Sequence, residues 1–383
     1  MPGQRRTELD AARGLMLVWM ALTHLPTAAS IVSSEPIGYA TAAQGFIFLS
    51  GLFCGLIYFR LAMRRGYRAM TARLWKRAVR LYGYVVLLLA MAFLVVAPIA
   101  AGGGMPGLHN LLDFFYTAGP QRAVPDALAL IYQPPLLDIL PMYVIFMLAT
   151  PLALILARRV GWAPLLAVSF AIWVGAQFDL RDAAHAFLVA QTPLRIPRHE
   201  MGSFDLYGWQ FLWLAALYLG VRWAADDLPI VSWARRLAMP ALAIAIALFV
   251  ARFVIGDGTG LWAASVDKWH LGVVRLVDFV AISLLLVRYQ AFFIRFASRP
   301  LILLGQASLQ VYCVHLLFCF AGLGLMGESP RLMAFWPQVI LIAATLTAML
   351  ITATVFARKT PSQVLMPPAQ RRPGMPALQR SER

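Results

Sequence analysis

The sequence predicts an all-α membrane protein with about ten transmembrane helices and both termini on the cytoplasmic side. Of its 383 residues, 61% are hydrophobic and only 13% are charged, and the mean hydropathy is +0.72. An ordinary soluble domain carries roughly 25% charged residues, so the composition excludes that class. The net charge of +16 resembles that of a nucleic-acid-binding protein, but the positions of the basic residues indicate a membrane topology instead.

Ten apolar segments approach or reach the roughly 17–25 residues that a transmembrane helix needs. They cover residues 11–32, 40–60, 81–101, 138–157, 161–178, 207–224, 236–254, 271–289, 301–325 and 333–356. We interpret the first as an uncleaved helix, because charged residues and a histidine interrupt any signal-peptide pattern. The segments predict a helical transmembrane domain over residues 1–357. Residues 358–383, which are basic and rich in proline, are predicted to form a disordered cytoplasmic tail.

The basic residues alternate in density from one predicted loop to the next. One side of the predicted membrane holds 25 of the 33 Lys and Arg residues, in the N-terminus, residues 60–80, three later loops and the tail. Cytoplasmic loops carry such an excess. The distribution therefore predicts that both termini are cytoplasmic, and it makes a phospholipid bilayer, not a nucleic acid, the expected partner.

The first segment carries an arginine and a histidine on one helical face. Arg13 and His24 lie eleven residues apart, which is about three turns and roughly 16 Å along a helix axis, and Asp10 lies one turn before Arg13. Ionisable groups inside a membrane face the protein interior or a cavity. A neutral imidazole can accept a proton from a hydroxyl that attacks an acyl carbon, so His24 is the candidate catalytic base. The alternative is a histidine that only hydrogen-bonds a neighbouring helix.

A second candidate site is the basic face that leads into the third segment. It consists of Arg73, Lys76, Arg77 and Arg80. Guanidinium groups match phosphate geometry, so this face is a candidate for binding a phosphorylated cytoplasmic donor. Attraction to anionic lipid explains the same residues without a ligand.

Further polar residues lie within apolar segments. Ser308, Tyr312 and His315 form one stripe, which either lines a site or joins two helices. Arg275 and Asp278 are spaced for an ion pair, and Gln44 is a possible polar lining residue. The remaining histidines show no metal-ligand spacing, so we expect no metal, and no nucleotide-binding loop is present.

Several blocks of the sequence, in order, resemble the OpgC family, whose members are tied to succinyl modification of osmoregulated periplasmic glucans. These blocks are ELDAARGLMLVWMALTHLP, AAQGFIFLSGLFCGLIY, QPPLLDILPMYVIFMLATPL, GWQFLWLAALYLG, DKWHLGVVRLVDFVAISLLLV and LGQASLQVYCVHLL. The resemblance implies kinship with ten-helix transmembrane acyltransferases, which take an acyl group from coenzyme A in the cytoplasm and deliver it to an acceptor outside.

The resemblance also implies residue roles. His24 matches the essential histidine and Arg13 the arginine before it, while Arg73, Arg77 and Arg80 resemble the segment that binds coenzyme A phosphates. Two positions depart from the family pattern, because Thr23 and Gln44 stand where acidic residues are expected. If a carboxylate orients the histidine, Asp10 or Asp278 is expected to supply it here.

Taken with this resemblance, the sequence predicts a bacterial inner-membrane O-acyltransferase that uses acyl-coenzyme A, and the resemblance alone implies succinyl-coenzyme A as one donor and a periplasmic glycan as acceptor. A glycan or lipid transporter that uses the same polar cavity is the first alternative. A non-catalytic scaffold of a glucan-synthesis complex is the second, which Thr23 and Gln44 keep open. Binding of acyl-coenzyme A distinguishes the enzyme from both.

Overall fold

The computed structural model describes residues 7–192, 195–327 and 334–359, and within these ranges the chain is helical and contains no strand. Of the predicted tail, residues 358 and 359 form the end of helix α19 (Phe335–Lys359), and residues 360–383 lie outside the described residues, as do residues 1–6. The α-helices are α1 (Thr7–His24), α2 (Ala28–Ser33), α3 (Ala42–Met91), α4 (Ala97–Gly103), α5 (Pro106–Leu111), α6 (Asp113–Ala118), α7 (Pro120–Leu128), α8 (Ile139–Val160), α9 (Trp162–Ala176), α10 (Leu180–Gln191), α11 (Leu206–Ala224), α12 (Pro229–Arg236), α13 (Ala238–Val254), α14 (Gly260–Ser265), α15 (Val273–Arg288), α16 (Gln290–Phe293), α17 (Arg299–Gln306), α18 (Ser308–Met326) and α19 (Phe335–Lys359).

The longest helix, α3, contains two of the predicted segments and the basic residues between them. It is broken at Gly66, whose backbone has a φ of +84°, a conformation that glycine adopts readily and other residues adopt rarely. A π-helical turn at Ala92–Val96 joins its second arm to α4. Residues 60–80 are therefore helical on both sides of a single break, and are not a loop.

The number of helices that meet a length and composition test for membrane spans is smaller than the ten predicted. Four qualify outright, and seven do if each bent pair of helices is counted as one span. Three bent pairs account for the difference between four and seven: α9 with α10 at 82°, α12 with α13 at 77°, and α15 with α16 at 76°. Part of the remaining shortfall arises because α3 merges two predicted segments and α1 carries three charged residues.

Small residues allow the central helices to approach closely. A Cβ atom at Gly55 of α3 would lie 2.2 Å from a backbone oxygen of α11, and one at Gly220 of α11 would lie 2.1 Å from a backbone oxygen of α3. Gly14 of α1 and Gly305 of α17 approach each other's helix in the same way, at 2.0 and 1.8 Å. Such contacts are typical of helix packing in membranes, and they place α1 deep inside the bundle, beside α3, α17 and α18.

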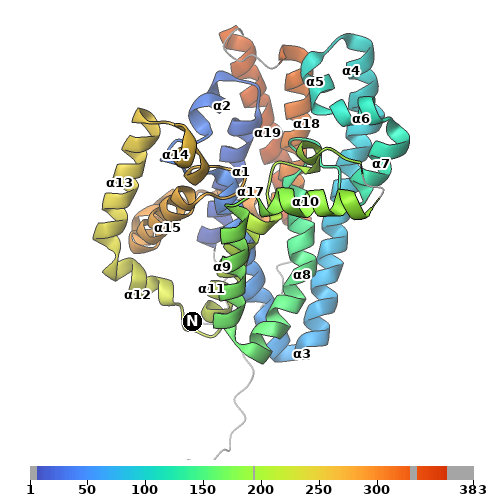
Figure 1. Cartoon of the computed structure of the whole chain (residues 1–383). Coiled ribbons are helices and arrows are strands. Elements are labelled where there is room, and N and C mark those ends of the chain that lie inside the picture. The colour runs from blue at the N-terminus through green and yellow to red at the C-terminus, as the bar shows by residue number, and fades with distance from the viewer. Residues whose placement is uncertain (1–6, 193–194, 328–333, 360–383) are drawn as a thin grey trace, which may run out of the picture.

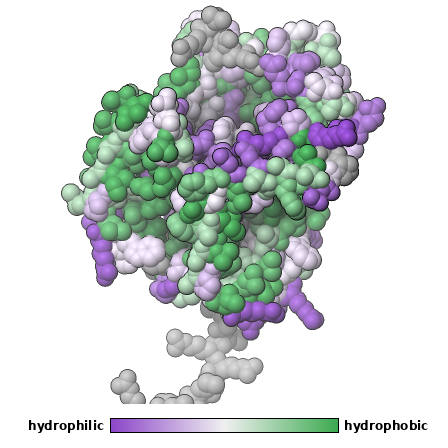
Figure 2. Space-filling model, in the orientation of Figure 1, coloured by the Kyte–Doolittle hydropathy of each residue, from purple (hydrophilic) through white to green (hydrophobic). Residues whose placement is uncertain are grey.

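The surface distribution of apolar residues fits a membrane protein. Hydrophobic surface covers α13 and the lower parts of α8 and α9, while hydrophilic residues gather in a band at and above α10 (Figure 2). Large apolar side chains such as Val168, Ile246, Phe253 and Val254 are more than half exposed. An apolar surface of this extent requires a nonpolar solvent, which is the bilayer.

The two ends of the molecule differ in what they contain. The lower end in Figure 1 holds the break in α3, the α8–α9 junction and α12, whereas α2 and the short helices α4 to α7 lie at the upper end. Exposed arginines gather at the lower end: Arg64, Arg65, Arg68, Arg158, Arg159, Arg235 and Arg236. This end is the one that the basic-residue distribution predicts to be cytoplasmic.

Candidate functional site

The polar stripes predicted on two separate segments face each other in the structure. Arg13 of α1 donates a hydrogen bond from Nη2 to Oγ of Ser308 on α18, at 3.0 Å. Eleven residues further along α1, Nδ1 of His24 lies 3.2 Å from Nε2 of His315 on α18. The two helices therefore make a polar contact near each end of their shared face.

The histidine pair is held in a defined orientation. The rings of His24 and His315 stack with their centroids 5.5 Å apart and their planes 21° apart, and His315 is fully buried. The ring of Tyr312 contacts His315 edge-on at 4.8 Å, and its hydroxyl donates to the backbone oxygen of Leu136 at 3.1 Å. When Nδ1 of His24 donates its proton to His315, Nε2 of His24 carries a free lone pair.

A second polar cluster lies toward the start of α1 and is centred on two arginines. Nη2 of Arg77 donates to the Tyr143 hydroxyl at 3.2 Å, and Arg13 and Arg77 interact electrostatically with each other. The Arg13 guanidinium lies 5.3 Å from the ring centroid of Phe53. Its Nε is buried and has no hydrogen-bond partner in the described part of the chain.

The charge of this cluster is largely positive. Among the described residues, neither Arg13 nor Arg77 lies within ion-pair distance of a carboxylate, although Asp10 also acts on Arg13 electrostatically. Buried arginines normally have an anionic partner, because an unpaired buried charge is costly. We refer to Arg13, Arg77 and Tyr143 as the arginine cluster.

Only part of the predicted basic face contributes to the arginine cluster. Arg77 is partly buried, whereas the side chains of Arg73, Lys76 and Arg80 are exposed. The inward-facing residues around Arg77 are Met70, Leu74, Ala78 and Leu81, and Arg77 lies at the edge of that stripe. The structure therefore brings Arg77 to Arg13 but leaves the other three basic residues on the outer surface of α3.

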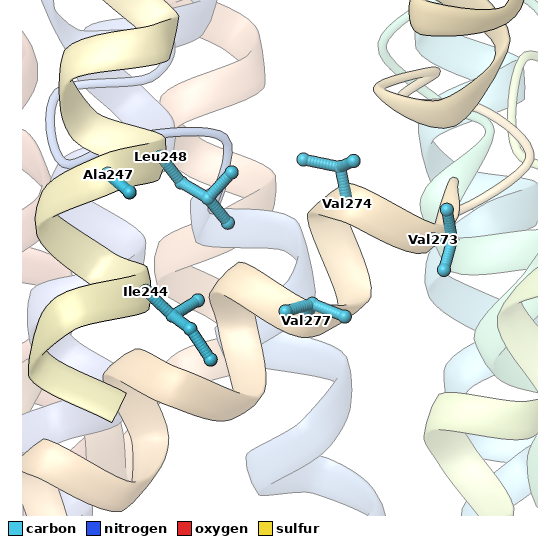
Figure 3. Close-up of a pocket in the computed structure, with 6 residues that line it drawn as sticks. All are labelled: Ile244, Ala247, Leu248, Val273, Val274 and Val277. Atoms are coloured by element: carbon cyan, nitrogen blue, oxygen red, sulfur yellow. The ribbon is translucent and has the colours of Figure 1, made fainter. Parts of the chain in front are cut away.

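The face of α1 between the histidine pair and the arginine cluster is apolar. Leu17 and Met20 lie there and are buried to 0% and 2% exposure in the main hydrophobic core. The pocket in Figure 3 lies elsewhere, between α13 and α15, and measures about 290 Å³. Its lining is wholly apolar: Ile244, Ala247, Leu248, Val273, Val274 and Val277. It supplies no polar group to a reaction.

The other predicted lining residues make structural contacts. Gln44 forms a capping box with Thr41 at the start of α3 and donates to the backbone oxygen of Arg275 at 3.3 Å. Arg275 forms an ion pair with Glu35 at 2.5 Å. Glu35 therefore takes the place of Asp278, the partner that the sequence predicted. Glu35 also pairs with Arg252 at 2.6 Å.

The carboxylates expected to orient His24 are engaged elsewhere. Asp278 accepts hydrogen bonds from the backbone nitrogens of Tyr39 and Ala40 at 2.7 and 3.1 Å, while Asp10 accepts one from Gln306 at 3.5 Å. Thr23 bonds to the backbone oxygen of Trp19 at 3.0 Å. His315 is the side chain that contacts the His24 imidazole, in place of the expected acid.

Two residues that contact the described polar groups were not predicted as site residues. Tyr143 and Glu35 gave no signal, because one lies in an apolar run and the other in a short loop. In the described part of the chain, no group of three or more His, Cys, Asp or Glu side chains is placed to hold a metal ion.

Comparisons with known proteins give a family and no closer relative. No curated protein and no solved structure matches the chain. The family model described as OpgC protein matches residues 5–360, which is nearly the whole chain, and the chain therefore belongs to the OpgC family.

Proposed function

We propose that this protein is a membrane O-acyltransferase that moves an acyl group from cytoplasmic acyl-coenzyme A to a hydroxyl of a periplasmic glucan or another glycan. Membership of the OpgC family suggests glucan modification by a transferase. The observation that carries the acyl-transfer proposal is the contact between His24 and His315 at 3.2 Å, on the same face of α1 as Arg13.

In the proposed reaction His24 acts as general base. Nε2 of His24 takes the proton of the acceptor hydroxyl, whose oxygen attacks the thioester carbonyl carbon. The tetrahedral intermediate collapses, the carbon–sulfur bond breaks, and the sulfur leaves as the coenzyme A thiol with the proton returned by His24. General acid–base catalysis of this kind contributes roughly 10²–10⁴-fold in rate.

The arginine cluster is the proposed site for the donor. Arg13 and Arg77 interact electrostatically with each other and have no carboxylate within ion-pair distance among the described residues, and a phosphate group of coenzyme A would supply the missing anion. The exposed Arg73, Lys76 and Arg80 are proposed to add attraction at the cytoplasmic entrance. Leu17 and Met20, which pack between the two clusters, must then move when the pantetheine arm extends toward His24.

We further propose ten membrane passages in the bacterial inner membrane, with both termini in the cytoplasm. The two arms of α3 count as two passages, α1 and α11 as one each, and α17 with α18 as one. The exposed arginines at the lower end support a cytoplasmic location for that end. Arg13 then lies nearer the cytoplasm, and His24 lies nearer the opposite side.

The test uses His24→Ala, with His199→Ala as the matched control, because the His199 side chain is 77% exposed. Membranes that contain each protein receive succinyl-coenzyme A and a linear glucan, and acylated product is measured by mass spectrometry. We expect His24→Ala to lose transfer at least 100-fold while it elutes as a folded protein in detergent. Unchanged transfer by His24→Ala would reject the proposed mechanism.

A binding experiment separates the enzyme from a transporter or scaffold. Purified wild-type protein should bind coenzyme A, and Arg13→Gln combined with Arg77→Gln should weaken binding by more than tenfold. Arg122→Gln, which changes an arginine in α7, serves as the control. A wild-type protein that transports glucan but binds no coenzyme A would favour the transporter.

A further inference from the structure

The helices α12, α13 and α15 form a small unit beside the main bundle. Ala234 of α12, Ala241 of α13, and Ala281 and Leu284 of α15 make a hydrophobic core that is separate from the main one. These helices lie together at one side of the molecule in Figure 1, with α12 at the lower end. Within α13, which the structure describes in full, only Ala241 is buried, so most of this helix faces the bilayer.

Two short segments at one end of this unit run across the direction of its long helices. α12 makes an angle of 77° with α13, and residues 290–296, which contain α16, make an angle of 76° with α15. Ile230 of α12 packs in the same core as Val287 near the end of α15, so both segments lie at the same end. Because α13 and α15 expose large apolar side chains to the bilayer, segments nearly perpendicular to them lie close to the plane of its surface.

Both segments have the composition of helices that lie at a membrane surface. α12 buries Ala234 and exposes Trp233, Arg235 and Arg236. The second segment exposes three aromatic rings and one arginine: Phe292, Phe293, Phe296 and Arg295. Aromatic residues together with arginines are typical of helices in the interface between lipid and water.

Four exposed arginines on these elements have no acidic partner. They are Arg235, Arg236, Arg288 and Arg295. None of them forms an ion pair with any residue that the structure describes. The sequence contains no Asp or Glu from residue 228 to 256 or from residue 279 to 327. The charge at this end of the unit is therefore complementary to an anion.

An apolar groove lies between α13 and α15 and measures about 370 Å³. It is distinct from the pocket in Figure 3, because no residue lines both. Its walls include Ile246 and Phe249 of α13 and Leu285 and Leu286 of α15. A groove with this lining binds hydrocarbon.

The end of the groove lies next to the arginines. Leu285 lines the groove about one turn before Arg288, and it also packs against the core that includes α12. Phe293 lines the groove two residues before Arg295. An apolar groove that leads to a group of cations at the bilayer surface matches a molecule with a long hydrocarbon chain and an anionic head.

We propose that this groove and its arginines bind an anionic glycerophospholipid, with one acyl chain between α13 and α15 and the phosphate at the four arginines. Basic pockets between transmembrane helices bind anionic lipid headgroups. The groove favours a lipid over a soluble phosphate, because a soluble phosphate has no apolar part to bury. The proposal concerns the surface of the unit and does not depend on acyl transfer.

The experiment measures lipid binding to the full-length protein, purified in detergent and freed of lipid, by native mass spectrometry. Phosphatidylglycerol and phosphatidylcholine with identical acyl chains are titrated separately. An arginine near anionic lipid contributes about fivefold in affinity, which is about 1 kcal/mol. We therefore expect Arg235→Gln combined with Arg236→Gln to weaken phosphatidylglycerol binding roughly 25-fold, and the wild type to prefer phosphatidylglycerol by at least that factor.

Two pairs of variants separate a site from general surface charge. Arg158→Gln with Arg159→Gln removes two exposed arginines from the same end of the molecule but from α8, and it should leave the affinity within about threefold. Leu286→Trp fills the groove and should weaken binding at least tenfold, whereas Leu242→Trp, on α13 outside the groove, should not. All the substituted side chains are exposed, so every variant should unfold at the wild-type temperature.

Four results would overturn the proposal. Affinities for the two lipids within threefold of each other would show that the head is not recognised. An equal loss in the Arg158 and Arg159 variant would show an attraction shared by all arginines at this end. Full binding by Leu286→Trp would show that no chain lies in the groove, and glycerol phosphate binding as tightly as the lipid would show a site for soluble phosphates. Because the arginine and groove variants are independent, either one decides the question if the other fails to fold.

Discussion

Replacement of His315 tests whether the histidine pair acts as one unit. His315 is fully buried and contacts Nδ1 of His24 at 3.2 Å. His315→Gln keeps a polar acceptor of similar length, whereas His315→Leu keeps the volume and removes the acceptor. The comparison between these two variants isolates the hydrogen bond from the packing.

The expected magnitude follows from the energy of one hydrogen bond. A buried hydrogen bond contributes about 0.5–1.5 kcal/mol net, and about 1.4 kcal/mol corresponds to tenfold. His315→Leu should therefore turn over roughly 2- to 12-fold more slowly than His315→Gln. The orientation of His24 is lost in the Leu variant, but its lone pair is retained, so the loss should be far smaller than that of His24→Ala.

The assay measures kcat for acyl transfer in detergent, with unfolding temperature as the check on folding. The same two substitutions are then made in the His24→Ala background, where the pair no longer exists and they should have no further effect. Cys319→Ala, at a buried position one turn further along α18, controls for a change in the helix core. Equal rates for His315→Gln and His315→Leu, or the same loss in the His24→Ala background, would refute the argument.

Three further predictions concern stability in detergent. Gly55→Ala forces a Cβ into the α11 backbone and should destabilise by about 1–3 kcal/mol, while Gly83→Ala, where a Cβ meets open space, should be neutral or stabilising; thermal unfolding checks both. Glu35→Gln leaves the buried Arg275 guanidinium without its carboxylate and removes one of two carboxylates from the partly exposed Arg252, and it should cost about 3–5 kcal/mol, whereas Asp257→Asn, at 71% exposure, should cost less than about 1 kcal/mol. The hydrogen bond with the Asp267 carboxylate raises the pKa of His270, although partial burial and the nearby Arg198 act in the opposite direction. Its stabilisation is therefore full below about pH 6.5 and lost as pH rises through the raised pKa; a difference in unfolding temperature between wild type and His270→Gln that grows with pH would contradict this.

Helical periodicity accounts for what the sequence predicted correctly about the site region. Residues three, four, seven or eleven apart share a face of a helix, so Arg13 with His24, and Ser308 with His315, were each assigned to one face without a structure. Because polar groups avoid lipid, both faces were also predicted to lie inside the bundle. Their mutual contact across α1 and α18 agrees with that assignment.

Periodicity does not say which partner a side chain finds on another helix. The sequence predicted that Arg275 pairs with Asp278 on its own helix, but in the structure Arg275 pairs with Glu35, which lies in a loop far away in the sequence. The order of helices around α15 decides this choice, and it depends on packing that is not local in sequence. The bends lie at or next to the ends of the predicted segments 161–178, 236–254 and 271–289, but their angles of 82°, 77° and 76° depend on tertiary contacts that the sequence does not show.

The close approach of α1 and α17 connects the packing to the chemistry. Gly14 and Gly305 bring these helices together at backbone distance, and α17 leads directly into α18, which carries Ser308 and His315. The spacing between Arg13 and His24 on α1 is roughly 16 Å, and the spacing of their partners on α18 is roughly 10 Å, a difference that the long Arg13 side chain can span to reach Ser308. A bulkier residue at Gly14 would push α1 from α17 and lengthen the contact between His24 and His315, although neither histidine had been changed. The close packing at Gly14 and Gly305 therefore sets the position of the proposed catalytic base as well as the packing of the helices.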